Sequence, residues 1–523
     1  MARQIAIAVA LVASLVGVGL ADVKLPGVLS DNMVLQQGQK ITIWGTADAG
    51  EKVAVALGAA KADATADDKG KWQVVFEPLA ASDKPIEMTV AGKNTLKVAN
   101  ILVGEVWLCS GQSNMQMPVQ GSKDAAQEIA SADFPSIRLM NVGRVKAELP
   151  QEDFGARWVL CSPKTVGGFS AAGYFFGREI HKALKVPVGL INSSWGGSPI
   201  EAWIPMETYQ SAPFLAQNFL KAIELQTAGL SAARETYATD VVKWKETTLA
   251  ITTTRPGSSS QPGFPRKPQP PESAGETYGG MYNAMVAPLT RLKIAGVIWY
   301  QGEANSANPS GYQHELPAMI GGWRKAFGQE FPFLFVQLPN FQTRGDDPNA
   351  NIGWATFREA QETVLSVPKT GMAVTIDVGE AKDIHPKDKQ TVGHRLALVG
   401  LGVVYGKTDV VYQGPTLESM KVDGEKVVVT FKHSDGGLVG KGDNGQVSGF
   451  AIAGADGKYA WADAKIDGNS VTLTSKVVTK PVAVRYAFNG NPAATLYNKF
   501  DLPAVPFRAG EQGFTPATAP ATK

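Results

Sequence analysis

The stretch Val106-Trp-Leu-Cys-Ser-Gly-Gln-Ser-Asn114 joins a short apolar run to a polar turn that contains glycine. A continuous apolar run of this length, without alternation, is typical of a strand that is buried on both faces of a sheet. The turn that follows places a serine hydroxyl and two side-chain amides directly after the strand. This stretch therefore predicts a buried parallel strand that delivers reactive side chains to one edge of a sheet.

The same pattern recurs along the chain. Further apolar runs, each followed by a polar or glycine-containing loop, lie at residues 188–192, 295–300, 333–336 and 372–376. Segments with the periodicity of amphipathic helices lie between them, at residues 171–184, 312–327, 355–365 and 389–403. Buried strands that alternate with amphipathic helices predict an α/β fold of three layers, in which helices cover both faces of a parallel sheet.

Segments with a different pattern flank and interrupt this α/β region, which spans residues 101–408. Short alternating strands separated by turns predict a β-sandwich-like module over residues 22–100 and a second β module over residues 409–512. Residues 206–275 interrupt the α/β rhythm with a helical excursion and a return rich in Pro, Ser and Thr. Residues 513–523 are expected to form a frayed tail.

The N-terminus has the features of a secretory signal peptide over residues 1–21. Arg3 precedes a long uncharged apolar stretch, and Gly19-Leu-Ala21 provides a cleavage site with small residues. An N-terminal membrane anchor is the alternative, because the apolar stretch is nearly long enough to span a bilayer. The cleavage pattern favours export, so we expect a periplasmic or extracellular mature chain, without stable membrane insertion, that begins at Asp22.

Composition narrows the functional classes. The 523 residues are 44% hydrophobic and 19% charged, which is typical of a folded chain of several domains and excludes disordered and polytopic membrane proteins. The net charge of +2 indicates no nucleic-acid partner. With five histidines, a multi-histidine metal cluster is not expected. The two cysteines, Cys109 and Cys161, form either one disulfide or two buried apolar positions.

Reactive side chains gather at the predicted carboxyl ends of the strands, where open parallel sheets bind ligands. These ends carry Ser113, the pair Gly196 and Gly197, Gln301, and the segment Asp383-Ile-His385. A serine nucleophile needs a base, the base needs an orienting acceptor, and the oxyanion needs fixed donors. The set therefore indicates acyl transfer. Each residue also has an ordinary structural explanation. Ser113 could cap a helix, and Gln301 could cap a strand. Gly196 and Gly197 could simply form a tight turn.

His385 is the favoured base among the five histidines. The other four lie inside predicted helices or in the distal β module, and they are His181, His314, His394 and His433. Asp383 precedes His385 by two residues, and positions two apart share a face in extended backbone. Asp383 is therefore a candidate to orient the imidazole, although it is equally suited to bracing its own loop.

Four blocks of sequence resemble, in order, those of the sialate O-acetylesterases within the SGNH hydrolase superfamily. They are the segments 104–115, 189–198, Trp299-Tyr-Gln-Gly-Glu303 and Asp383-Ile-His-Pro386. The resemblance covers residues 101 to about 405 and implies an SGNH-like α/β/α domain. It implies that Ser113 is the nucleophile and His385 the general base. It also implies that Gln301 and a glycine of Trp195-Gly-Gly197 donate to the oxyanion.

Two departures from the superfamily pattern leave the third member of the triad open. The acid usually stands three residues before the histidine, where this chain has Lys382, and its carboxylate is one residue nearer, at Asp383. Glu303 or a backbone carbonyl is therefore an alternative partner for His385. The amide block is Gln-Gly-Glu rather than the more usual block built on asparagine.

The resemblance implies a serine esterase that removes O-acetyl groups from carbohydrate without a metal or cofactor, with 9-O-acetylated sialic acid as the favoured substrate. Acetylated xylan or another polysaccharide is the alternative substrate. A non-catalytic carbohydrate-binding protein of the cell surface is the alternative class, disfavoured by the intact set of reactive residues. Asn114, Glu303 and Arg358 are expected to contact substrate. Arg358 is a candidate partner for a sialate carboxylate, with an ordinary ion pair as the alternative.

Overall fold

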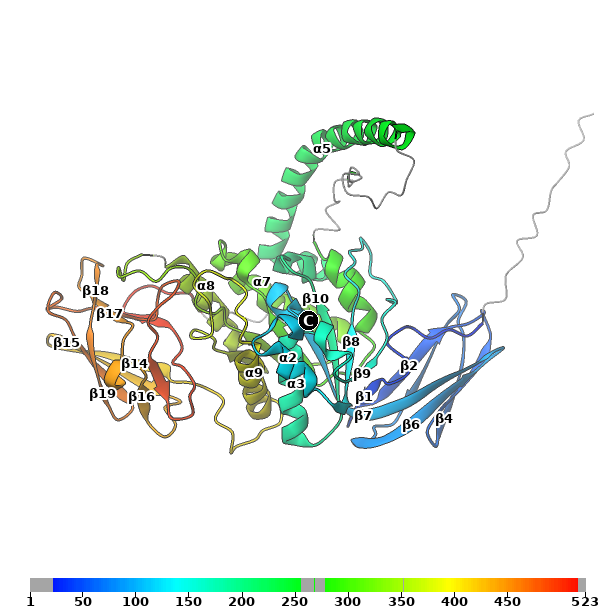
Figure 1. Ribbon diagram of the computed structural model, residues 1–523, viewed down its shortest axis with the longest axis horizontal. Helices are drawn as coiled ribbons and strands as arrows, with labels where there is room; N and C mark the ends of the chain where they lie inside the picture. Colours follow the sequence, from blue (N-terminus) through cyan, green and yellow to red (C-terminus); the bar gives the residue numbers. More distant parts are fainter. Residues whose placement is uncertain (1–21, 255–267, 269–277, 351, 516–523) are drawn as a thin grey trace, which may run out of the picture.

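The computed structural model describes residues 22–254, 268, 278–350 and 352–515. The signal peptide predicted at 1–21, most of the return of the insert and the last residues of the tail lie outside the described residues. Figure 1 shows the α/β region between two β modules, the N-terminal one on the right and the C-terminal one on the left.

The predicted parallel sheet is confirmed. Its strands lie in the order β13-β12-β11-β7-β10-β8-β9, and all neighbours pair in parallel except β8 with β9. Their bounds are β7 Thr95–Gly111, β8 Phe134–Asn141, β9 Val159–Cys161, β10 Val188–Ser194, β11 Gly296–Tyr300, β12 Phe333–Val336 and β13 Thr370–Ala373. The residues of β10, β11 and β12 are buried throughout, because helices cover both faces of the sheet.

Helices complete the three layers. On one face, α3 (Ala171–Leu184) packs against α9 (Lys389–Val403) so closely that a Cβ on Gly393 would lie 2.5 Å from Phe175. On the other, α7 (Pro309–Phe327) packs on β11 through Trp299, which meets Trp323 edge to face. The remaining helices of the α/β region are α1 (Ser113–Gln116), α2 (Ala125–Ala130) and α8 (Gly353–Glu362).

The N-terminal β module is continuous with the central sheet. Strand β7 begins among the module's strands, where it pairs with β6 (Ser82–Ala91) and β1 (Val34–Gln36), and it ends in the centre of the parallel sheet. The boundary expected between residues 100 and 101 therefore lies inside one strand. The other strands of this module are β2 (Ile41–Thr46), β3 (Lys52–Leu57), β4 (Ala60–Thr65) and β5 (Lys71–Phe76).

The C-terminal module contains two antiparallel sheets of four strands, β14-β15-β20-β19 and β18-β17-β21-β23, and the small pair β16-β22. Their bounds are β14 Thr416–Asp423, β15 Lys426–Lys432, β16 Leu438–Gly440, β17 Phe450–Ala453, β18 Tyr459–Trp461, β19 Asp463–Asp467, β20 Ser470–Thr474, β21 Ala483–Tyr486, β22 Leu496–Asn498 and β23 Phe507–Ala509.

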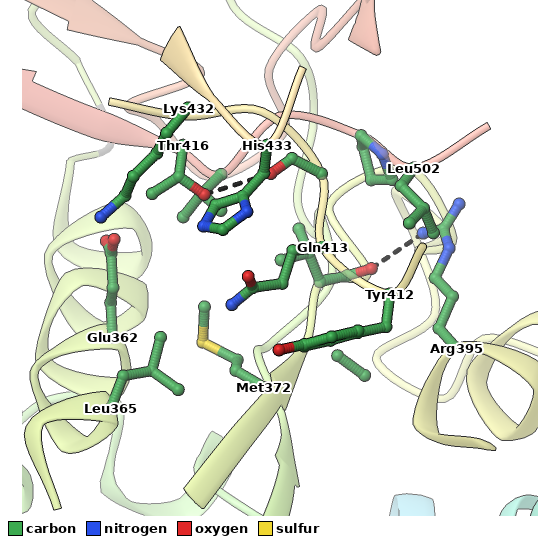
Figure 2. Close-up of a pocket in the computed structure, with 15 residues that line it drawn as sticks. Glu362, Leu365, Met372, Arg395, Tyr412, Gln413, Thr416, Lys432, His433 and Leu502 are labelled. Atoms are coloured by element: carbon green, nitrogen blue, oxygen red, sulfur yellow. Dashed lines mark hydrogen bonds between the residues drawn. The ribbon is translucent and has the colours of Figure 1, made fainter. Parts of the chain in front are cut away.

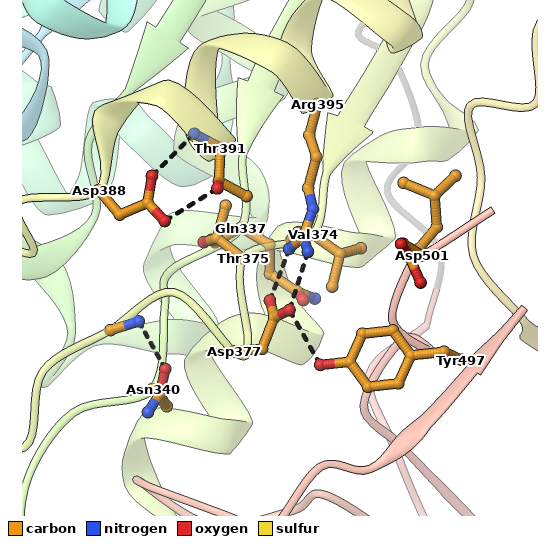
Figure 3. Close-up of polar contacts among 12 residues, drawn as sticks. Gln337, Asn340, Val374, Thr375, Asp377, Asp388, Thr391, Arg395, Tyr497 and Asp501 are labelled. Carbon is orange, nitrogen blue, oxygen red and sulfur yellow. Dashed lines mark hydrogen bonds and ion pairs between the residues drawn. The ribbon is translucent and has the colours of Figure 1, made fainter. Parts of the chain in front are cut away.

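Asp377 joins this module to the α/β region. Its carboxylate accepts hydrogen bonds from Arg395 of α9, at 2.5 and 2.8 Å, and from the Tyr497 hydroxyl of β22, at 2.9 Å (Figure 3). Burial alone would raise the pKa of Asp377, but the Arg395 guanidinium and the Tyr497 hydroxyl hold that pKa below its usual range. The carboxylate therefore stays charged and fixes the module against α9.

The insert projects from the α/β region as a long helix. After α4 (Met206–Ser211), α5 runs over Pro213–Thr254 and extends away from the body of the molecule (Figure 1). In the part of the chain that the structure describes, no helix combines the length and apolar character needed to cross a membrane. Cys109 and Cys161 are buried and free, so the disulfide alternative is excluded.

Candidate active site

A sharp turn at the end of β7 presents Ser113. Gly111 has a φ of +136°, and a Cβ at this position would lie 2.2 Å from the Tyr300 carbonyl oxygen, so only glycine fits. The Gln112 N–H donates to that same carbonyl at 3.0 Å. Ser113 then begins the single turn of α1, at the carboxyl edge of the sheet between β10 and β11.

His385 contacts this serine from a loop that follows β13. The His385 Nε2 lies 2.8 Å from the Ser113 Oγ, within hydrogen-bond distance. The loop ends where Asp388 caps α9, since the Asp388 carboxylate accepts from the Thr391 N–H and hydroxyl, each at 2.9 Å (Figure 3). Two residues 272 positions apart in the sequence are thus brought into the contact that a nucleophile–base pair requires.

Asp383 lies beside His385 but holds the imidazole weakly. Its Oδ1 is 3.5 Å from the His385 Nδ1, beyond ordinary hydrogen-bond distance, and accepts instead from the His385 backbone N–H at 2.9 Å. The side chains of the pair are 41% and 46% exposed. The carboxylate therefore braces the loop, and solvent screens its attraction for a protonated imidazole.

Replacing Asp383 with asparagine is expected to lower kcat by less than about 10-fold, in contrast to the loss of about 10⁴-fold known for a buried triad aspartate. Asparagine keeps the oxygen that accepts the His385 N–H. Initial rates of acetate release under saturating substrate measure the effect. A loss of 10³-fold or more would show that Asp383 orients the imidazole tightly during turnover.

Gly196 lies against Ser113, whereas Gly197 shapes the turn. A Cβ on Gly196 would lie 3.3 Å from the Ser113 Cβ, and the Gly196 N–H donates to the Gln116 Oε1 at 2.6 Å. Gly197 has a φ of +74° and open space where a side chain would stand. Sequence reasoning missed Gln116, whose only signal is its place one helical turn after Ser113.

The structure gives Gln301 a role other than the predicted one. Its side chain is fully buried, and its Nε2 donates to the Asn305 Oδ1 at 2.8 Å and to the Ser198 carbonyl at 3.2 Å. Both amide hydrogens are therefore in use, and no donor is free for an oxyanion. In this arrangement Gln301 braces the glycine loop, and the expectation that it donates to the oxyanion is corrected.

Asn114 and Glu303 contact each other beside Ser113, and the Asn114 side chain and the Glu303 Oε2 are enclosed by protein. Asn114 is fully buried, and its Nδ2 donates to the Glu303 Oε1 at 2.5 Å. Burial raises the pKa of Glu303, opposed by the Asn114 hydrogen bond and the charge of Lys389. Since the Glu303 carboxylate contacts Asn114, Glu303 is not the partner of His385 either. The expected substrate contacts of both residues are corrected.

Lys389 is the second residue that sequence reasoning missed. It is the first residue of α9, is fully buried, and donates from its Nζ to the Asn114 Oδ1 at 2.7 Å. Burial lowers the pKa of Lys389 to about 7, against the opposing charges of Glu303 and nearby carboxylates. The only signal in the sequence is its place three residues after Pro386.

Arg358 is a structural residue. It is fully buried on α8, and its guanidinium donates to four backbone carbonyls, those of Leu338, Pro339, Asn489 and Gly490. Burial lowers its pKa to about 9. The group is enclosed and its donors are committed, so the expected pairing with a sialate carboxylate is wrong. Arg358 instead ties the α/β region to the C-terminal module.

A separate cavity lies between the α/β region and the C-terminal module. Figure 2 shows Glu362, Gln413 and His433 around this cavity of about 300 Å³. None of the residues predicted to act in catalysis lines it. No cluster of three or more metal-ligating side chains was found among the described residues.

Comparisons with known proteins identify the family that the chain resembles. The family model described as "Carbohydrate esterase, sialic acid-specific acetylesterase" matches residues 103–230 and 229–400. The chain is 31% identical to a rat sialate O-acetylesterase over 92% of this chain and 93% of the relative, and 30% identical to the human protein over 92% and 91%. It also resembles the crystal structure of a carbohydrate acetylesterase from Xanthomonas citri, with a TM-score of 0.77, 35% identity, and 93% and 99% of the two chains covered.

Proposed function

Since the chain belongs to the sialic acid-specific acetylesterase family of carbohydrate esterases, we propose that Ser113 and His385 carry out its ester hydrolysis. The family hydrolyses carboxylic esters on carbohydrate. For this chain we propose a serine mechanism in which acetate leaves an O-acetylated sugar. The contact of 2.8 Å between the Ser113 Oγ and the His385 Nε2 carries this proposal.

In the first half of the reaction, the Ser113 Oγ attacks the acetyl carbonyl carbon and the His385 Nε2 takes the serine proton. The tetrahedral intermediate then expels the sugar hydroxyl, which receives that proton from His385. In the second half, a water attacks the acetyl-serine with His385 as base. Acetate leaves, and the proton returns to Ser113.

Backbone groups are the proposed oxyanion donors. Ser113 opens α1, and the first N–H groups of a helix have no intrahelical acceptor. The Gly196 N–H lies against Ser113, where the Gln116 Oε1 accepts from it. We expect the acetyl oxygen to replace the Gln116 oxygen as the acceptor for Gly196, so the Gln116 side chain turns away when substrate binds.

The favoured substrate is O-acetylated sialic acid, because the matching relatives are named sialate O-acetylesterases, and we propose O9 as the acetylated position. A second candidate is an O-acetylated polysaccharide such as acetylxylan. Two observations favour it: Arg358 is not available to a sialate carboxylate, and the similar Xanthomonas citri structure is described more broadly as a carbohydrate acetylesterase. We also propose that the chain is exported, from the signal-peptide pattern of residues 1–21.

Acetate release from 9-O-acetyl sialic acid, acetylated xylan and an aryl acetate tests the proposal. We expect hydrolysis of all three to depend on Ser113, with the highest kcat/KM on 9-O-acetyl sialic acid. A higher kcat/KM on acetylated xylan would identify the polysaccharide as the substrate. Absence of acetate release from every acetylated sugar, with glycan binding retained, would instead identify a carbohydrate-binding protein.

A further inference from the structure

A buried polar network joins the three segments that build the catalytic pair. Asn114 of α1 stands at its centre and follows the nucleophile directly. Its Nδ2 donates to the Glu303 Oε1, in the turn after β11, at 2.5 Å, and its Oδ1 accepts from the Lys389 Nζ at 2.7 Å. Asn114 and Lys389 are fully buried, so these contacts are shielded from water.

This network also holds the backbone on both sides of His385. The Ile384 carbonyl, just before the histidine, accepts from the Asn114 Nδ2 at 3.0 Å. The Pro386 carbonyl, just after it, accepts from the Lys389 Nζ at 2.5 Å. The backbone that carries the base is thus fastened at two points to the residue that follows the nucleophile.

Fastening of this kind matters because the usual orienting contact is weak here. The Asp383 Oδ1 lies 3.5 Å from the His385 Nδ1, and both side chains are nearly half exposed. A misplacement of about 1 Å between reacting groups can cost about 100-fold in rate. Buried charge-assisted hydrogen bonds fix a backbone more firmly than a screened surface contact does.

We propose that Lys389 is a positioning residue for the Ser113–His385 pair, acting through Asn114 and the Pro386 carbonyl. This inference rests on the proposed serine mechanism. Glu303 supports this role in two ways: its charge offsets that of the buried Lys389, and its Oε1 accepts from the Asn114 Nδ2. The buried network thereby helps to orient His385, a function that a buried acid has in other serine hydrolases.

The test separates the loss of positioning of Ser113 and His385 from the effect of leaving a buried charge unpaired. Lys389→Met alone leaves the Glu303 carboxylate enclosed without its positive partner, which is expected to destabilise the fold. The double variant Glu303→Gln, Lys389→Met removes both charges and keeps the shape of the site. We expect its thermal midpoint to stay within about 4 °C of the wild-type value. Its kcat on an aryl acetate is expected to fall about 10- to 100-fold, while KM changes less than about 2-fold.

Lys387→Met is the matched control, because this lysine lies in the same loop but is exposed. The kcat of the Lys387→Met protein is expected to equal that of the wild type. A double variant that folds and turns over at the wild-type rate would overturn the inference. A double variant that does not fold would also overturn it, because the role would then be in folding. If Ser113→Ala retained activity, the serine mechanism itself would fail, which is a different result from either.

Discussion

Replacing Ser113 with alanine is expected to lower the rate of acetate release by about 10⁴- to 10⁶-fold, because no acetyl-enzyme can form without the hydroxyl. Alanine suits the first position of a short helix, so the fold should be unchanged. The measurement is kcat on an aryl acetate and on an acetylated sugar, with circular dichroism and the thermal midpoint as evidence of folding.

Ser110→Ala is the matched control for this prediction. Ser110 lies on β7, three residues before Ser113, and is fully buried, and its hydroxyl has no hydrogen-bond partner among the described residues. Its removal is therefore expected to leave the rate unchanged. A Ser113→Ala protein with more than about a tenth of the wild-type rate would require a different nucleophile, since no residual route gives that rate.

Replacing Arg358 with methionine is expected to lower the free energy of unfolding by about 3 kcal/mol or more. The change leaves the carbonyls of Leu338 and Asn489 without a donor, and each buried acceptor left unpaired costs about 1–3 kcal/mol. The carbonyls of Pro339 and Gly490 lose one donor each but keep the Trp354 indole N–H and the Phe341 N–H. The total loss of stability is smaller than the sum of these costs, because the variant no longer buries a charge and because neighbouring contacts do not contribute additively. Denaturant unfolding followed by tryptophan fluorescence measures the change.

Arg344→Met is the control for this stability prediction. Arg344 also donates to carbonyls of the C-terminal module, those of Asn491 and Pro492, but it is exposed and its contacts are 3.4 and 3.3 Å long. Its loss is expected to cost less than about 1 kcal/mol. If the free energy of unfolding fell no more in the Arg358 variant than in the Arg344 variant, the buried Arg358 guanidinium would not be what holds the C-terminal module in place.

The local sequence pattern was sufficient to predict much of the fold. The helices predicted at 171–184 and 389–403 have these same bounds in the structure, because Ser170 and Asp388 cap them. The strand-end rule also brought Ser113 and His385 together. Both residues follow buried strands whose carboxyl ends lie at the same edge of the sheet. Their strands, β7 and β13, are separated by β11 and β12, so the contact also needs the long loop after β13.

Contacts between distant segments account for what the sequence did not reveal. Arg358 has an ordinary place on an amphipathic helix, and only the fold brings Gly490, 132 residues away, to its guanidinium. Asn114 and Lys389 are 275 residues apart, so their hydrogen bond has no local signal. Gln301 stands at a strand end, as predicted, but the partners that occupy its amide depend on how the 198 and 305 turns pack.

Peptide mapping of the protein after reaction with a fluorophosphonate tests the central claim most directly. Such a reagent bonds covalently to an activated serine and so reports the nucleophile itself. We predict one adduct per chain, on the peptide that contains Ser113, with loss of acetate release in proportion to labelling and no adduct in the Ser113→Ala protein. An adduct on another residue, or full labelling of Ser113 with acetate release undiminished, would contradict the account.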